Sequence, residues 1–207
     1  MKSGKYVHIE TEYNKKYISK NPIIIFINNH FLSRVGSFVE SINCPSILDV
    51  GCGEGIVTNY LTKKLSINES QIAGLDIDIN LLKIAKSINP RVQFHQGSVY
   101  ELPFQDNSFD LVLALEILEH LEFPERAIKE LNRVSNNWVF ISVPNDRMFR
   151  FGNIMRFKYI SSGGKTPDHI QHWNKKTFKD LISRYLNIVK IKLPCFLWLM
   201  LLCRTKK

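Results

Sequence analysis

The stretch that decides the fold is ILDVGCGEG, residues 47–55, in which an apolar run leads into three alternating glycines. Glycine permits tight backbone turns and lets a ligand approach the main chain closely. The amino terminus of a helix that follows such a turn attracts a carboxylate or a phosphate. The stretch therefore predicts a strand, a turn and a helix that together bind a nucleotide-like ligand.

Two details of the turn bear on the class of ligand. Gly51, Gly53 and Gly55 form GxGxG, which lacks the third-glycine spacing of the GxGxxG motif in dinucleotide-binding proteins. Asp49 places a carboxylate at the end of the strand, and this charge suits an ammonium group better than a pyrophosphate. The alternative interpretation is a simple tight connection in which Asp49 accepts hydrogen bonds from backbone amides.

Short apolar runs alternate with longer amphipathic runs between residues 46 and 143. This alternation is typical of parallel strands connected by helices, and it predicts an α/β domain. The expected strands are residues 46–50, 71–75, 92–95, 110–115, 138–143, 187–193 and 195–203. The expected helices are residues 55–65, 80–87, 124–134 and 175–185.

The chain is expected to divide into a small cap and a main domain. Residues 22–42 have the pattern of one amphipathic helix, so residues 1–43 are expected to form an N-terminal helical cap over the site. Residues 44–207 are expected to form the main domain. Within it, glycines and a proline between residues 145 and 173 indicate a lid-like insertion with little regular structure.

The net charge of +9 over 207 residues is unevenly distributed. Residues 147–207 carry 14 basic and two acidic side chains, whereas residues 21–146 carry nine basic and 15 acidic ones. A basic last third suits an anionic acceptor, a nucleic acid backbone or an anionic membrane surface. A solvated basic face explains the same charges equally well.

The four cysteines form neither a CxxC pair nor a zinc-type cluster, which fits reduced thiols in the cytosol. No export signal is evident near the amino terminus. The strongest apolar run, residues 193–203, is 11 residues long, against the roughly 20 that a spanning helix requires. We therefore expect a cytoplasmic protein without a transmembrane segment. Peripheral contact with a membrane surface is compatible with this expectation.

Three segments taken together are far more specific than the glycine turn alone. They are LDVGCGEG (48–55), GLDID (74–78) and LPFQDNSFDLVLALEILEHL (102–121). Over roughly residues 44–144 the combination resembles the class I S-adenosylmethionine-dependent methyltransferases, in particular the small-molecule branch that includes enzymes of ubiquinone and menaquinone biosynthesis. The resemblance implies a Rossmann-like three-layer sandwich with a seven-stranded, mostly parallel sheet and an antiparallel last strand. It also implies S-adenosylmethionine as the cofactor.

The resemblance also assigns the cofactor-binding positions. In the family the glycine loop holds the methionine part, an acid after the second strand holds the ribose, and residues after the third strand flank the adenine. The matching positions, together with an acid at the end of the fourth strand, are Asp49, Gly51, Cys52, Gly53, Asp76, Ile77, Ser98, Val99 and Glu116. Ser98 stands where the family usually has Asp, so adenine recognition would be weaker or made through a backbone group. Asp76 could instead cap the next helix, although Asp78 is the better cap candidate.

The expected acceptor side of the site is formed by histidines in two segments of the chain. His120 is the first candidate for a catalytic base, because the usual pKa of histidine suits proton transfer near neutrality. A purely structural histidine fits equally well, and Glu119 is expected to face solvent. In the segment PDHIQHW, His169, His172 and Trp173 are expected to contact the acceptor or to anchor the lid. The HxxH pair has no third ligand at suggestive spacing, so no metal site is expected.

The resulting expectation is methyl transfer to an oxygen, nitrogen or carbon of a small-molecule or lipid-like acceptor. An NAD(P)-dependent oxidoreductase and a non-catalytic cofactor- or RNA-binding module are the alternatives. A nucleic acid acceptor is possible but not favoured, because ALEILEH after the fourth strand lacks the Asn/Asp-Pro-Pro-aromatic signature of exocyclic-amine methyltransferases. The sequence sets no oligomeric state.

Overall fold

The computed structural model describes residues 21–42, 44–145, 148 and 169–207. The chain divides into two compact units, Met1–Ser98 and Val99–Lys207. Most of the lid-like insertion expected at 145–173 lies outside the described residues, as do residues 1–20 of the expected cap.

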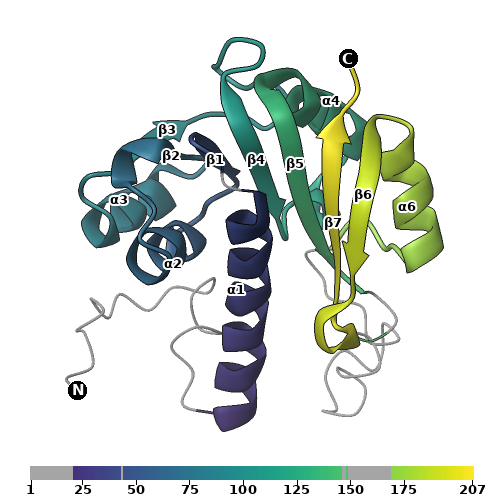
Figure 1. Ribbon diagram of the computed structural model, residues 1–207, viewed down its shortest axis with the longest axis horizontal. Coiled ribbons are helices and arrows are strands. Elements are labelled where there is room, and N and C mark those ends of the chain that lie inside the picture. The colour runs from purple at the N-terminus through teal and green to yellow at the C-terminus, as the bar shows by residue number, and fades with distance from the viewer. Residues whose placement is uncertain (1–20, 43, 146–147, 149–168) are drawn as a thin grey trace. The chain divides into compact units, whose positions relative to one another are not determined.

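The first unit contains three parallel strands in the order β3-β2-β1 (Figure 1). They are β1 (Ile47–Val50), β2 (Ile72–Asp76) and β3 (Gln93–Gln96). The helices of the unit are α1 (Pro22–Ile42), α2 (Ile56–Lys64), the short η1 (Glu69–Gln71) and α3 (Ile79–Ile88). Every residue of β1 is buried, as its apolar run predicts for a strand covered on both faces.

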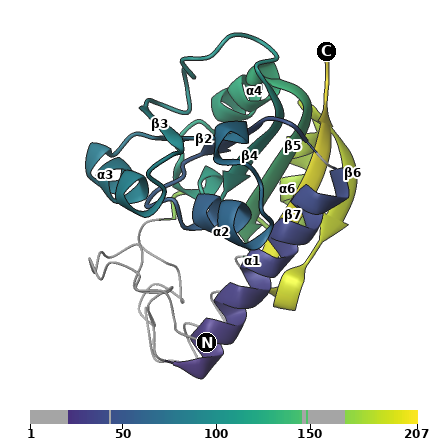
Figure 2. The ribbon, with the colours of Figure 1, turned by 60° about the vertical axis from the view of Figure 1, so that its left-hand side comes forward.

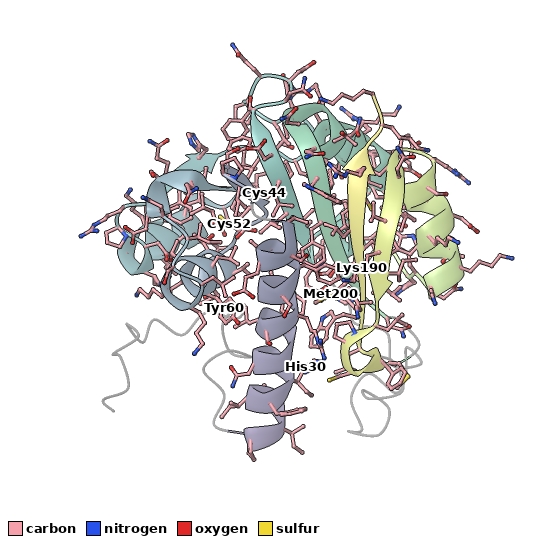
Figure 3. The ribbon with its side chains drawn as sticks, viewed as in Figure 1. His30, Cys44, Cys52, Tyr60, Lys190 and Met200 are labelled. Atoms are coloured by element: carbon pink, nitrogen blue, oxygen red, sulfur yellow. The ribbon has the colours of Figure 1, made fainter. Side chains whose placement is uncertain are left out.

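Helix α1 has the bounds that its amphipathic pattern predicts, and it packs against α2 (Figure 2). The two helices approach closely at Gly36, where an added Cβ would lie 3.0 Å from the ring of Tyr60. Figure 3 labels Tyr60 on α2 and His30 on α1. The small residue therefore sets the distance between the two helices.

The second unit contains four strands in the order β4-β5-β7-β6. They are β4 (Phe109–Leu115), β5 (Ser135–Pro144), β6 (Leu186–Lys192) and β7 (Trp198–Thr205). The helices among its described residues are α4 (Pro124–Val134), α6 (Lys175–Ser183) and the short η2 (Leu118–His120) and η4 (Pro194–Phe196). Strands β4 and β5 are parallel, and β7 runs antiparallel to both of its neighbours. Met200 is buried on β7, whereas Lys190 is exposed on β6 (Figure 3).

The expected fold class is confirmed. The described residues form seven strands, most of which are separated by helices, although β4 follows β3 without one. Within each unit every described strand runs in the same direction except β7. The start of the last strand was wrongly predicted at residue 195. Cys195 and Phe196 have φ angles of 49° and 58°, so η4 makes a turn there before β7 begins at Trp198.

No helix in the part of the chain that the structure describes combines the length and the hydropathy needed to cross a bilayer.

A pair of buried asparagine amides connects α2 to the end of α3. Asn59 Nδ2 donates to Asn89 Oδ1 over 2.9 Å, and Asn89 Nδ2 donates to the Gly55 carbonyl over 3.1 Å. Asn89 also packs against Gly55, where an added Cβ would lie 2.8 Å from its Nδ2. The pair thereby holds the last residue of the glycine turn against the helix that follows β2.

We predict that Asn89→Ala lowers the free energy of unfolding by about 1–3 kcal/mol, because it leaves the buried Asn59 amide without this acceptor. Urea denaturation followed by circular dichroism measures the change. Asn68→Ala, which removes the exposed capping side chain of η1, is the control and should cost less. Equal losses in the two variants would contradict a special role for the buried pair.

Candidate functional site

The glycine turn between β1 and α2 is fastened to the neighbouring strand. The three glycines have positive φ angles, which residues other than glycine rarely adopt: 70° at Gly51, 52° at Gly53 and 70° at Gly55. The N–H groups of Gly51 and Cys52 both donate to the Leu75 carbonyl, over 2.7 and 3.0 Å. A Cβ added to Gly53 would meet nothing within 4 Å. The turn therefore leaves open space at its middle glycine.

Asp76, the last residue of β2, organises the same turn. Its Oδ2 accepts a hydrogen bond from Gly53 N over 2.8 Å, and its Oδ1 accepts one from Asp78 N over 3.0 Å. Each carboxylate oxygen retains a further lone pair, and the side chain is only partly buried, so Asp76 can also accept bonds from two hydroxyl groups of a ligand. The N-cap of α3 is Asp78, as expected, because its Oδ1 accepts from Asn80 N over 2.8 Å.

Asp49 is a buried carboxylate on β1 with 2% of its surface exposed. Burial raises its pKa to about 7; the hydrogen bond from the Thr58 hydroxyl opposes this shift, and the negative charge of Asp76 adds to it. The Thr58 Oγ1 to Asp49 Oδ2 distance is 2.9 Å. A carboxylate held in this way gains most from a ligand that brings a positive charge, such as an ammonium group.

Cys52 and Ile77 complete the predicted positions near the turn. Cys52 is buried, and burial followed by the charges of Asp49 and Asp76 raises the pKa of its thiol, so it stays protonated and packs as a small side chain. Ile77 follows Asp76 directly and is 70% exposed, an unusual state for a large apolar side chain. Gln96 Nε2 donates to its carbonyl over 3.1 Å, which ties this corner to β3.

The first unit thus brings together the predicted residues of the glycine turn and of the β2 terminus. Ser98 is the last residue of that unit and is partly buried. The second unit contains the other predicted site residues, which are Val99, Glu116, His120, His169, His172 and Trp173.

Glu116 lies directly after β4 and is held by two side chains that no sequence motif indicates. Its Oε1 accepts from the Ser142 hydroxyl and its Oε2 accepts from the Trp198 indole N–H, both over 2.8 Å. Its φ angle is 57°, a conformation that costs a side-chain-bearing residue roughly 1 kcal/mol or more. Trp198 lies 82 residues away in sequence, so no local pattern could indicate this contact.

Glu119 is buried, with 2% of its surface exposed, so the expectation that it faces solvent was wrong. The reason is a chain segment that returns about 50 residues later. The N–H groups of Ile170 and Gln171 both donate to the Glu119 carbonyl, over 2.9 and 3.0 Å, and cover this part of η2. His120 Nε2 lies 4.0 Å from Glu119 Oε1, and the ring centroids of His120 and His169 are 5.1 Å apart.

The other two residues of the histidine segment have different surroundings. Trp173 is buried and packs against Phe178 of α6, with ring centroids 5.3 Å apart. His172 is exposed. The position of Trp173 fits the anchoring interpretation better than contact with an acceptor.

The central part of the chain is similar to known methyltransferases. A family model described as a methyltransferase domain matches residues 48–137. Ajmaline N-methyltransferase of Rauvolfia serpentina is 35% identical over 96 residues, which cover 44% of this chain and 32% of the relative. The mitochondrial ubiquinone biosynthesis O-methyltransferase of Candida albicans is 29% identical over 109 residues, covering 48% and 32%. The chain therefore spans about a third of the length of these curated relatives.

A solved structure shares the fold over nearly the whole chain. It is the magnesium protoporphyrin IX methyltransferase from Synechocystis PCC 6803, with bound SAH. The TM-score is 0.70 at 13% identity, and the match covers 94% of this chain and 93% of that one. At this identity the likeness shows the fold alone.

We predict that Asp49→Asn stabilises the protein at pH 8 by about 1–4 kcal/mol, because the folded wild type must ionise a buried group there. The pKa of Asp49 is raised from 3.8 to about 7, so the wild type loses stability as pH rises from 4 to 7 and carries the full penalty above 7. The advantage of the variant should therefore shrink as pH falls toward 4. Urea denaturation across this range measures it.

Asp180→Asn, at an exposed position on α6, is the control and should change the unfolding midpoint little at any pH. An advantage of Asp49→Asn that did not vary with pH would show that ionisation of Asp49 is not its cause.

Proposed function

Because a family model described as a methyltransferase domain matches residues 48–137, in agreement with the resemblance, we propose that this chain is an S-adenosylmethionine-dependent methyltransferase acting on a small-molecule or lipid-like acceptor. The observation that carries the proposal is the pair of acids at the glycine turn. One, Asp49, is buried and suits an ammonium group; the other, Asp76, suits a pair of hydroxyls.

The residues of the first unit fit the cofactor. Asp49 would bind its amino group, the open space at Gly53 would admit its amino acid part, and Asp76 would accept from both ribose hydroxyls. Ile77, with Ser98 and Val99, would flank the adenine, and Cys52 would pack beside the turn. When bound, S-adenosylmethionine supplies a methyl group that its positively charged sulfur has already activated.

The protein's own part in such a reaction is to orient the acceptor and to exclude water. Glu116 would approach the cofactor or the acceptor at the end of β4, where Ser142 and Trp198 hold its carboxylate in one orientation. His120 is proposed as the catalytic residue on the acceptor side, with His169 and His172 as acceptor contacts and Trp173 anchoring their segment. Two of the relatives are an N-methyltransferase and an O-methyltransferase by name, which supports a small-molecule acceptor with a nitrogen or an oxygen as the methylated atom.

The proposal extends to location and partners. A cytoplasmic protein is proposed, and its basic last third would attract an anionic acceptor or a membrane surface carrying one. A nucleic acid acceptor is less favoured, because the segment after β4 lacks the motif that exocyclic-amine methylation requires.

We predict that Asp76→Asn weakens binding of S-adenosylhomocysteine about 10- to 100-fold, because an amide replaces charge-assisted hydrogen bonds. Isothermal titration calorimetry of the full chain measures the dissociation constant. Asp78→Asn is the matched control two residues away. Asn is as good an N-cap as Asp, so this variant should keep both its stability and its affinity.

Unchanged affinity in a folded Asp76→Asn protein would contradict the ribose assignment. The same calorimeter tests the oxidoreductase alternative with NADH. Tight binding of NADH without binding of S-adenosylhomocysteine would reject the proposed function.

We predict that His120→Ala lowers turnover at least about tenfold while it changes cofactor affinity less than twofold, because the residue acts on the acceptor. The assay measures release of S-adenosylhomocysteine with an acceptor identified by screening small hydroxyl- and amine-bearing compounds. Wild-type kinetics in this variant would remove His120 from the site.

A further inference from the structure

We propose that Glu119, His120 and His169 bind a divalent transition-metal ion. Each of the three side chains offers one ligand atom, a carboxylate oxygen or an imidazole nitrogen, and these atoms all lie within 4.8 Å of one another. Metal–ligand bonds of about 2.0–2.2 Å place the ligand atoms of one ion roughly 3–4 Å apart. Side-chain rotations that shorten the longest separation by about 1 Å therefore suffice to complete the site.

The backbone holds the two parts of this cluster together. Glu119 and His120 belong to η2, whereas His169 comes 49 residues later. Both backbone N–H groups that follow His169 donate to the Glu119 carbonyl, as described above. In addition, Gln171 Nε2 donates to the Leu121 carbonyl over 3.1 Å. Three hydrogen bonds therefore fix the His169 segment beside η2, which provides a prearranged set of ligands.

The orientation of the two imidazole rings is compatible with binding to one ion. The planes of His120 and His169 make an angle of 80°, so the rings meet edge to face and do not stack. His120 Nε2 already lies 4.0 Å from Glu119 Oε1.

The chemistry of the three ligands selects the class of ion. Two imidazole nitrogens and one carboxylate oxygen suit Zn²⁺, Mn²⁺, Fe²⁺ or Co²⁺ better than Mg²⁺ or Ca²⁺, which prefer oxygen ligands. Glu119 is buried, and an ionised carboxylate in such a position is stabilised by a cation beside it. The His120 side chain is 43% exposed, so the cluster is open to solvent on that side. Three protein ligands leave coordination positions for an exchangeable molecule.

This set differs from the pair that the sequence suggested. The HxxH spacing pointed to His169 and His172, but His172 is not part of the cluster. The missing ligands come from η2, which no spacing within the PDHIQHW segment could reveal. The fold thus supplies the third ligand whose absence argued against a metal.

A role for the ion rests on the proposed function. A metal ion with open positions binds an acceptor through an oxygen, orients it, and lowers the pKa of a bound hydroxyl, whose proton passes to solvent. The acceptor class would then be small molecules with a metal-binding hydroxyl or carboxylate group. His120 would support turnover as a ligand of the ion.

The test is metal binding by the full chain after treatment with a chelator and gel filtration. Titration with Co²⁺ followed by its visible spectrum, and with Zn²⁺ by calorimetry, should show one site per chain. His169→Ala and His120→Ala should each weaken binding about 100-fold, and Glu119→Gln should do so while preserving the shape of the buried side chain. His172→Ala is the matched control from the same segment and should bind the ions as the wild type does.

Several outcomes would overturn the proposal. One is a Zn²⁺ affinity that is equal in the wild type and in folded His120→Ala protein, and another is loss of the ion in His172→Ala instead. A thiolate charge-transfer band in the Co²⁺ spectrum would show cysteine ligands, and a site that takes Mg²⁺ alone would show oxygen ligands. Binding of S-adenosylhomocysteine is measured in parallel. If the chain binds S-adenosylhomocysteine but no transition metal, the metal site is refuted and the proposed function is not. If it binds the metal but not S-adenosylhomocysteine, the proposed function is refuted and the metal site is not.

Discussion

The arrangement of the first unit depends on the carboxylate of Asp76. It accepts from Gly53 N on one side and from Asp78 N on the other, so a single side chain closes the glycine turn and sets the start of α3. Both donors would otherwise have to find partners in water at the mouth of the turn. Because the same carboxylate is the proposed ribose ligand, the geometry of the turn and the geometry of binding share one group.

Asp49 shows the opposite balance between stability and binding. Asp49 is buried on β1 with 2% of its surface exposed, and its ionisation costs the folded state free energy above pH 7. Thr58 returns one hydrogen bond, which is less than a charged carboxylate needs. A strand selected for stability alone would carry an amide or an apolar residue there. The acid is therefore best explained by a cationic group that compensates its charge when a ligand is bound.

The sequence predicted those features that local physics decides. The glycine turn, the fully buried β1, the bounds of α1 and α4 and the Asp78 cap each depend on residues within a few positions of one another. It did not predict the Asn59–Asn89 pair, the contact of Trp198 with Glu116 or the burial of Glu119, because each joins residues 30 to 82 positions apart. Periodicity places a side chain on a face of its own element, whereas these contacts depend on which distant segment covers that face.

The same distinction separates the two halves of the proposed chemistry. The acids proposed to bind the cofactor lie at the ends of adjacent strands β1 and β2, so a short motif specifies them, and the methyltransferase-domain model matches this region of the chain. The groups proposed to handle the acceptor are assembled from η2 and from a segment about 50 residues later. Changes in that later segment can alter the acceptor-side ligands without disturbing the glycine turn.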